Sequence, residues 1–193
     1  MASGLAAETI SKARIVEAAR HRFEAFGYRR TSIAEIASAA GVAVGTVYRY
    51  FAGKEAVFLA VVQAMNDAWL AESRAALDGP GTATERLRRL GAASIRFAAE
   101  NALMTAIVTR DTDIVFAPLI EQLYEELQRR NVAMIADVIR DGIREGTFGN
   151  IDPERAAYVL SICGGILSLQ RHIPYAELMP VFEQIVYQGL LPR

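Results

Sequence analysis

A cluster of polar and aliphatic side chains in the segment VGTVYRY, residues 44–50, carries groups of the kind that contact a nucleic acid. Positions i, i+1, i+4 and i+5 share one side of a helix, so these residues would form one face and its flanks. The set comprises Val44, Gly45, Thr46, Tyr48, Arg49 and Tyr50. Hydroxyl groups can bind phosphates, Arg49 could bind a phosphate or read guanine, and Val44 could contact a thymine methyl group. The chemistry indicated is contact with duplex DNA, and an ordinary solvated helical corner is the alternative.

Two short helices would position this face. Apolar residues at positions 33, 36, 37 and 40 repeat at helical spacing, and Ser32 followed three residues later by Glu35 is a capping box. Gly41 follows the last apolar position, where a left-handed backbone suits glycine. A second helix over about residues 44–50 would turn Val47 inward. Two short helices joined by a tight, glycine-containing turn predict a helix-turn-helix, whose second helix enters the major groove.

The stretch GVAVGTVYRYFAGKEAV, residues 41–57, resembles the recognition helix and following helix start of the TetR family, the tetracycline-repressor-like regulators. The matching positions are Thr31, Ile33, Ile36, Ala37, Gly41, Val42, Gly45, Thr46, Val47, Tyr48, Phe51, Lys54 and Glu55. The resemblance covers roughly residues 12–60, whereas the later chain agrees in length and helical content only. It implies an all-helical homodimer with an N-terminal DNA-binding domain and a C-terminal ligand-sensing domain. It also implies that Thr31 lies near a phosphate and that Lys54 contacts one.

Two positions depart from the family pattern. Many members have a small hydroxyl residue where this chain has Ala43, so the side-chain cap of the second helix is missing, at a cost of about 1 kcal/mol. Where a polar residue that reads a base is common, this chain has Val44. The operator sequence of a relative therefore cannot be transferred to this protein.

The composition fits a folded protein of the cytoplasm. Of the 193 residues, 52% are hydrophobic and 22% charged, which suits a globular chain with a sizeable core. The single Cys163 excludes an internal disulfide framework and suits a reducing compartment. Residues 1–11 lack a basic start followed by an apolar run, so we expect no signal peptide. No apolar stretch approaches the ~20 residues that span a bilayer, so we expect no membrane association.

Charge is distributed unevenly along the chain. Residues 1–55 hold eight Lys or Arg against five Asp or Glu, whereas residues 56–193 hold thirteen against seventeen, so a net +3 precedes a net −4. The overall charge of −1 argues neither for nor against nucleic acid as a partner. A basic end on an acidic body would orient the protein in the field of the phosphates.

The rest of the pattern is helical, and we predict an all-α fold. A mobile arm, residues 1–7, would precede a first helix over residues 11–26 that stops at Gly27. Further helices are expected over about residues 54–77, 84–100, 102–109, 118–145, 154–171 and 175–191. The expected organisation is an N-terminal three-helix DNA-binding domain with the helix-turn-helix, residues 1–53. A larger helical ligand-binding and dimerisation domain, residues 54–193, follows it.

The last two predicted helices are apolar on more than one face, which exceeds the needs of an internal core. Two adjacent glycines in a helix interior cost roughly 1 kcal/mol each relative to alanine, and close approach of another backbone is a reason for them. We interpret these helices as a homodimer interface that forms a four-helix bundle, with a monomeric core as the alternative. The candidate interface residues are Ser161, Gly164, Gly165, Ser168, Phe182, Ile185 and Val186.

The family resemblance also implies a ligand pocket among the later helices. The candidate lining residues are Trp69, Phe97, Asn101, Met104, Arg110, Phe116 and Tyr124, with Arg110 as a charged anchor. Aromatic and methionine residues at helical spacing are more often core residues, so an ordinary place in the core is the alternative for each of these residues. An apolar lining would favour a hydrophobic or aromatic small molecule as the effector.

Patterns typical of catalysis or metal binding are not found. His21 and His172 fall among basic or apolar neighbours, and no serine elbow, phosphate loop or zinc-helix motif occurs. We therefore expect no catalytic residues, no metal and no cofactor. The predicted function is a homodimeric repressor that a small molecule releases from a palindromic, double-stranded DNA operator. The alternatives are a dimeric helical small-molecule binding protein or an enzyme, without DNA binding in either case.

Overall fold

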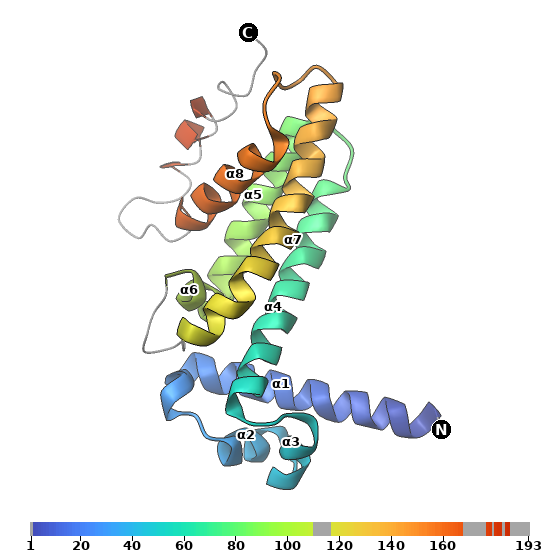
Figure 1. The fold of residues 1–193 in the computed structure, drawn as a ribbon, viewed down its shortest axis with the longest axis vertical. Helices are drawn as coiled ribbons and strands as arrows, with labels where there is room; N and C mark the ends of the chain where they lie inside the picture. Colours follow the sequence, from blue (N-terminus) through green and yellow to red (C-terminus); the bar gives the residue numbers. More distant parts are fainter. Residues whose placement is uncertain (1, 110–116, 168–176, 179, 183, 186–193) are drawn as a thin grey trace. The chain divides into compact units, whose positions relative to one another are not determined.

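The computed structural model describes residues 2–109, 117–167, 177–178, 180–182 and 184–185 (Figure 1). Within these ranges the chain forms helices and no strand, which confirms the predicted all-α fold. The helices are α1 (Ala2–Arg30), α2 (Ile33–Ala40), α3 (Val44–Tyr50), α4 (Lys54–Leu77), α5 (Ala83–Glu100), α6 (Ala102–Thr109), α7 (Ala117–Arg144) and α8 (Pro153–Leu167). The helix predicted over residues 175–191 falls largely outside the described residues.

Helix α1 is longer than predicted at its amino end and breaks where predicted. It begins at Ala2, so residues 2–7, expected to form a mobile arm, are helical instead. This segment is rich in alanine and has no proline, so it extends an already formed helix at little cost. Gly27 interrupts the helix with φ 76° and ψ 166°, a backbone conformation that favours glycine.

Both ends of α2 have the capping residues that the sequence predicted. The Ser32 hydroxyl accepts a hydrogen bond from the backbone N–H of Glu35 (3.3 Å), and the Glu35 carboxylate accepts one from the backbone N–H of Ser32 (2.8 Å). These two bonds complete the capping box of α2. At the other end Gly41 is left-handed (φ 65°), and the N–H of Val42 donates to the carbonyl oxygen of Ala37 (3.0 Å). The turn therefore determines where α3 begins.

A core of large side chains holds α1, α2, α3 and the first half of α4 together. Phe23 of α1 and Phe58 of α4 are fully buried and meet edge to face, with ring centroids 5.2 Å apart. Tyr28 packs against both rings. Ile36 of α2 and Val47 of α3 are also fully buried, so each short helix has one large anchoring side chain.

The chain divides into two compact units. The first comprises Met1–Asp67 and Ala102–Tyr124, and the second comprises Ala68–Asn101 and Glu125–Arg193. The domain boundary predicted between residues 53 and 54 falls inside the first unit, because the aromatic core includes Phe58 of α4. As a functional division between DNA binding and ligand sensing, that boundary stays a prediction.

In the second unit α5 packs against the carboxyl-terminal part of α7. Leu87 and Leu90 of α5 lie in one apolar core with Ile139 of α7 and Phe148. Gly142 is required where this core closes, because a Cβ atom there would lie 2.3 Å from the ring of Phe148.

Side chains also close the helix ends of the second unit. Nε of Arg86 donates to the carbonyl oxygen of Leu77 at the end of α4 (2.8 Å), and the same guanidinium pairs with Asp141 of α7 (2.8 Å). Asp152 accepts a hydrogen bond from the backbone N–H of the third residue after it (2.9 Å), and Pro153 is the first residue of α8. Among the described residues no helix is both long enough and apolar enough to cross a membrane.

Candidate nucleic-acid interface

The face of α3 that the sequence singled out is exposed to solvent. Its exposed residues are Val44, Gly45, Tyr48 and Arg49, and its half-buried residues are Thr46 and Tyr50. Val44 is 42% exposed and Tyr48 is 56% exposed, although both are large apolar side chains. Val47 and Phe51 point the other way and are buried. One side of α3 is therefore anchored in the core while the other is presented to a partner.

The amino end of α3 lies open. Ala43 occupies the cap position and makes no side-chain hydrogen bond there, as its residue type predicted. A Cβ atom built on Gly45 would meet no heavy atom within 4 Å. The surface at Val44 and Gly45 is therefore small and apolar, and it lets a partner approach the backbone of α3 closely.

The guanidinium of Arg49 turns toward Tyr50 at the edge of this face. Its Nη2 donates to the hydroxyl of Tyr50 (3.0 Å), and its Cζ lies 5.0 Å from the centroid of the Tyr50 ring. A cation–π contact at an exposed site contributes only about 0.5–1 kcal/mol. A phosphate or a guanine edge, which binds a guanidinium in a charge-assisted or bidentate way, would compete with this contact.

Thr31 and Lys54, which the family pattern places at phosphates, have their polar groups turned inward. Thr31 is only 2% exposed, and its hydroxyl donates to the carbonyl oxygen of Gly27 (2.8 Å). The ammonium group of Lys54 donates to the carbonyl oxygens of Tyr28 (2.9 Å) and Thr31 (3.0 Å). Both side chains therefore shape the turn between α1 and α2, and a phosphate contact from either one stays a prediction.

Two arginines of α1 bind the helix-turn-helix. Nη2 of Arg14 donates to the carbonyl oxygen of Ala40, the last residue of α2 (2.8 Å). Arg22 pairs with Glu35 (2.6 Å), and its Cζ lies 4.0 Å from the centroid of the Phe26 ring. Sequence reasoning missed these roles. The partner of Arg22 is Glu35, which lies 13 positions away on a different helix, and local helical spacing does not reveal such a pair.

The Glu35 carboxylate is well suited to its place at the start of α2. Hydrogen bonds from Ser32 lower the pKa of the Glu35 carboxyl, and the positive charge of Arg22 acts in the same direction. The capping box therefore keeps its charged partner at neutral and mildly acidic pH.

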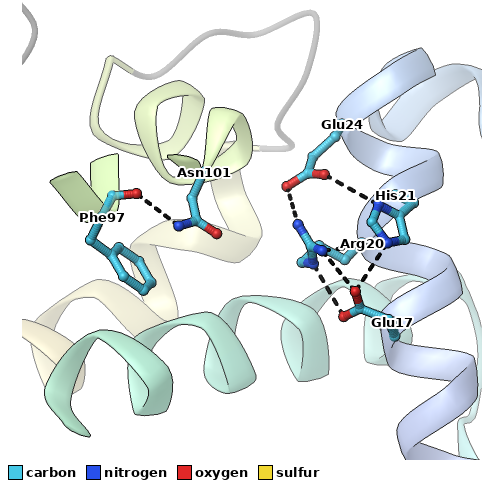
Figure 2. A network of polar contacts seen from close by, with 6 residues as sticks. All are labelled: Glu17, Arg20, His21, Glu24, Phe97 and Asn101. Carbon is cyan, nitrogen blue, oxygen red and sulfur yellow. Dashed lines mark hydrogen bonds and ion pairs between the residues drawn. The ribbon is translucent and has the colours of Figure 1, made fainter. Parts of the chain in front are cut away.

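Another part of α1 neutralises its own charges (Figure 2). Arg20 pairs with Glu17 (2.7 Å) and with Glu24 (2.8 Å), and His21 lies 3.0 Å from Glu17. The hydrogen bond from Arg20 is the main cause that lowers the pKa of Glu17. Because two carboxylates on the same helix balance Arg20, this part of α1 offers little positive charge to a phosphate backbone.

The candidate ligand-lining residues are distributed over both units. Phe97 is buried and Trp69 half-buried in the second unit, and Met104 is half-buried in the first. Nδ2 of Asn101 donates to the carbonyl oxygen of Phe97 (2.7 Å), so this amide caps the end of α5 (Figure 2). Outside the described residues lie Arg110, Phe116 and the side chain of Tyr124. The ligand pocket stays a prediction.

The candidate interface residues near the carboxyl end include an open glycine and an exposed aliphatic side chain. A Cβ atom at Gly164 would meet nothing within 4 Å, and Ile185 is 69% exposed. Ser161 accepts a hydrogen bond from Nε2 of Gln128 in the same chain (3.1 Å), and Phe182 is half-buried. Gly165 belongs to α8, and Ser168 and Val186 lie outside the described residues.

Sequence reasoning missed two exposed residues of α8. Tyr158 and Val159 are large and apolar, and Val159 is 56% exposed. The signal for them was already present, since α8 was predicted to be apolar on more than one face.

A short helix that presents hydroxyl groups, a guanidinium and an aliphatic side chain beyond a capped turn defines a helix-turn-helix DNA-binding protein. The family described as "Bacterial regulatory proteins, tetR family" matches residues 15–61, and the "Tetracyclin repressor-like, C-terminal domain" matches residues 80–167. The chain belongs to the TetR family. It is a DNA-binding transcriptional regulator and not an enzyme, in agreement with the sequence prediction.

Individual relatives agree with this assignment. The chain is 27% identical over 146 residues to the HTH-type transcriptional regulator YhgD of Bacillus subtilis, covering 76% of each protein. It is 27% identical over 134 residues to the HTH-type transcriptional repressor KstR2 of Mycobacterium tuberculosis, covering 69% of this chain and 67% of that one. Its fold matches that of the transcriptional regulator FadR of Bacillus subtilis in complex with stearoyl-CoA, with a TM-score of 0.76 and 18% identity, over 92% and 98% of the two chains.

Proposed function

We propose that this regulator is a homodimeric repressor that binds a palindromic DNA operator through α3 and leaves it when a small molecule binds. The exposed face of α3 carries the proposal, because Val44 and Tyr48 face solvent while Val47 is fully buried behind them. In this binding mode α3 enters the major groove, where Val44 contacts a thymine methyl group. Tyr48 and Arg49 contact bases or phosphates beside it.

The flanks of α3 and the charge of the amino-terminal part support this mode. Thr46 and Tyr50 lie at the edges of the face, and their hydroxyl groups donate hydrogen bonds to phosphates. Gly45 lets the backbone of α3 approach the DNA closely. The net charge of +3 over residues 1–55 attracts the phosphate backbone, and the net charge of −4 over residues 56–193 keeps the rest away from it.

Dimerisation through α8 and the carboxyl-terminal residues is part of the proposal. Tyr158, Val159 and Ile185 expose apolar surface, and Gly164 leaves room for a second backbone. Burying such surface against a two-fold related copy removes it from water and produces a closed, symmetric assembly. The two α3 helices would then bind half-sites about one DNA turn (~34 Å) or a simple variant apart.

Release by an effector requires two conformations of the dimer that differ in affinity for both operator and effector. We propose a hydrophobic or aromatic effector that stabilises the conformation in which the α3 helices are wrongly spaced. Two proteins support this choice by analogy: KstR2 is named a repressor, and FadR of Bacillus subtilis has been solved with stearoyl-CoA. The protein would act in the cytoplasm, where the DNA is.

A dimeric small-molecule carrier that no longer binds DNA is the alternative function. In such a carrier the exposed face of α3 would have no partner, so substituting Tyr48 and Arg49 would leave its activity unchanged.

The test is selection of bound duplexes from a random pool, together with footprinting on the DNA that flanks the protein's own gene. We expect a protected palindrome that the variant Tyr48→Ala/Arg49→Ala no longer protects, although the variant remains a dimer in sedimentation. The matched control is Arg129→Ala, which removes an exposed arginine from α7 and should bind as wild type does. Equal protection by the Tyr48/Arg49 variant would refute the assigned face.

A further inference from the structure

The ammonium group of Lys54 connects α4 to the turn between α1 and α2. Lys54 is the first residue of α4, and its Nζ donates to the carbonyl oxygens of Tyr28 (2.9 Å) and Thr31 (3.0 Å). The same Nζ lies 4.3 Å from the centroid of the Tyr28 ring. These partners are 26 and 23 positions away in the sequence, so the contact is tertiary and not local.

Each partner of Lys54 gains from this contact. The Tyr28 carbonyl lies just after the break at Gly27 and accepts a long hydrogen bond from the backbone N–H of Thr31 (3.4 Å), so the Lys54 ammonium gives it a shorter, charge-assisted one. The Tyr28 ring is buried against Phe23 and Phe58. The ring therefore provides a fixed platform beneath the ammonium group.

The second acceptor of Lys54, the carbonyl oxygen of Thr31, lies next to the start of α2. Its side chain is buried, and its hydroxyl donates to the carbonyl oxygens of Gly27 (2.8 Å) and Arg22 (3.3 Å). The next residue is Ser32, whose hydroxyl caps α2. A displacement of the Thr31 carbonyl therefore moves the capping box at the start of α2. The position of α2 in turn determines the positions of the next turn and of α3.

We propose that Lys54 is a positioning residue that latches the first turn of α4 to the turn between α1 and α2, and thereby sets the placement of α3. Two of its three N–H groups donate to backbone carbonyls, so the ammonium group is already engaged in contacts within the protein when no DNA is bound. Lys54 is the first residue of α4, so a movement of this first turn acts on the start of α2 through these two bonds. The consequence for operator affinity rests on the DNA binding proposed above.

The experiment compares Lys54→Met with Lys12→Met. Lys12 is the other lysine of the chain and is exposed, with its Nζ 5.7 Å from the centroid of the Phe51 ring. Both variants lose one positive charge from the same unit, but only Lys54→Met loses the two bonds to backbone carbonyls. Lys54→Arg retains a cation with several donors and serves as the conservative variant.

Two readouts separate the latch from other roles of Lys54. Affinity for the selected duplex and for random duplex is measured over a series of salt concentrations, below the unfolding temperature of every variant. A residue that only adds stability would leave these affinities unchanged, because the protein is folded throughout. Hydrogen exchange of the amides of residues 31–36 is measured without DNA, so it reports on the latch even if no specific duplex exists.

We expect Lys54→Met to weaken binding to the selected duplex about tenfold, with a salt slope equal to that of Lys12→Met, and Lys54→Arg to recover part of the loss. We also expect faster exchange over residues 31–36 in Lys54→Met than in Lys12→Met or wild type. Unchanged exchange in Lys54→Met would overturn the latch. So would an equal loss on both duplexes with a salt slope smaller by about 0.9, which is the sign of a lost phosphate contact. If wild type prefers no duplex, the proposed function fails, whereas the exchange measurement still decides the latch.

Discussion

Helices α3 and α8 both present large apolar side chains to solvent, but in different surroundings. On α3 the exposed Val44 and Tyr48 alternate with a glycine and an arginine, with hydroxyl groups on both flanks. On α8 the exposed Tyr158 and Val159 are followed by Gly164, and the charged residues of the helix are confined to its first turn. The first surface combines several donors for phosphates and base edges with a small apolar contact, whereas the second, beyond Arg155 and the Tyr158 hydroxyl, is mainly apolar and suits another apolar surface.

The two helices are also held in place by different means. Helix α3 has only seven residues, and its position depends on the capping box of α2, on Arg14 at the end of α2 and on Lys54. Helix α8 has fifteen residues and contributes Ala157 to the apolar core of the second unit. A short helix cannot be stable by itself, so α3 depends on hydrogen bonds around it as well as on its buried Val47, while the longer α8 packs directly into the core of its unit.

The largest effect is expected from a charge placed on the exposed face of α8. In Val159→Glu a carboxylate would have to be buried in the proposed dimer interface, so the dimer should dissociate. Operator affinity should then fall by at least about a hundredfold, because each α3 would bind its half-site alone. Sedimentation and operator binding measure the two losses. The matched control is Ala133→Glu, at an exposed position of α7, and a dimeric Val159→Glu protein would contradict the interface.

A second prediction concerns the charge on α3. Arg49→Ala should weaken operator binding about tenfold, and if the guanidinium binds a phosphate the slope of log affinity against log salt should decrease by about 0.9. Dimerisation should be unaffected, because Arg49 lies on α3. Fluorescence anisotropy of labelled operator over a salt series gives both numbers. Wild-type affinity for Arg49→Ala would show that α3 reads DNA without its only basic side chain.

The sequence predicted the parts of this comparison that depend on neighbouring residues. The capping pair Ser32 and Glu35 and the glycine at position 41 act within a few positions, so the ends of α2 could be placed from the sequence. The inward bonds of Lys54 and the pairing of Arg22 with Glu35 connect distant positions, and no local rule gives them. The sequence therefore predicted which side of α3 is exposed, but it did not predict the side chains that support this helix.

A third prediction sharpens the role of the apolar part of α3. If Val44 contacts a thymine methyl group, replacing the contacted thymine by uracil removes one methyl group from the interface without changing base pairing. Burial of one such group contributes about 0.8 kcal/mol, so we expect about fourfold weaker binding. Val44→Ala should bind the thymine and uracil operators equally well. Equal affinity of the wild type for every single uracil substitution in the selected operator would exclude the methyl contact.

The smallest effect is expected from the ion pair between Arg86 and Asp141 that supports the second unit. The hydrogen bond from Arg86 is the main cause that lowers the pKa of the Asp141 carboxyl below its ordinary value of 3.8. A depressed pKa means that the stabilisation is complete above the ordinary value and is lost as the pH falls through the folded-state value. The pair is partly exposed, so its contribution is about 1 kcal/mol or less.

Asp141→Asn should therefore lower the unfolding temperature slightly at pH 7, and the difference from wild type should disappear under strongly acidic conditions. Differential scanning calorimetry over a pH series measures it. Asp137→Asn, which changes a more exposed carboxylate of the same helix, is the control. A difference that persists at the lowest pH would mean that Asp141 contributes through packing rather than charge. Because α3 and its supports belong to the other unit, operator affinity at neutral pH should be the same for both variants.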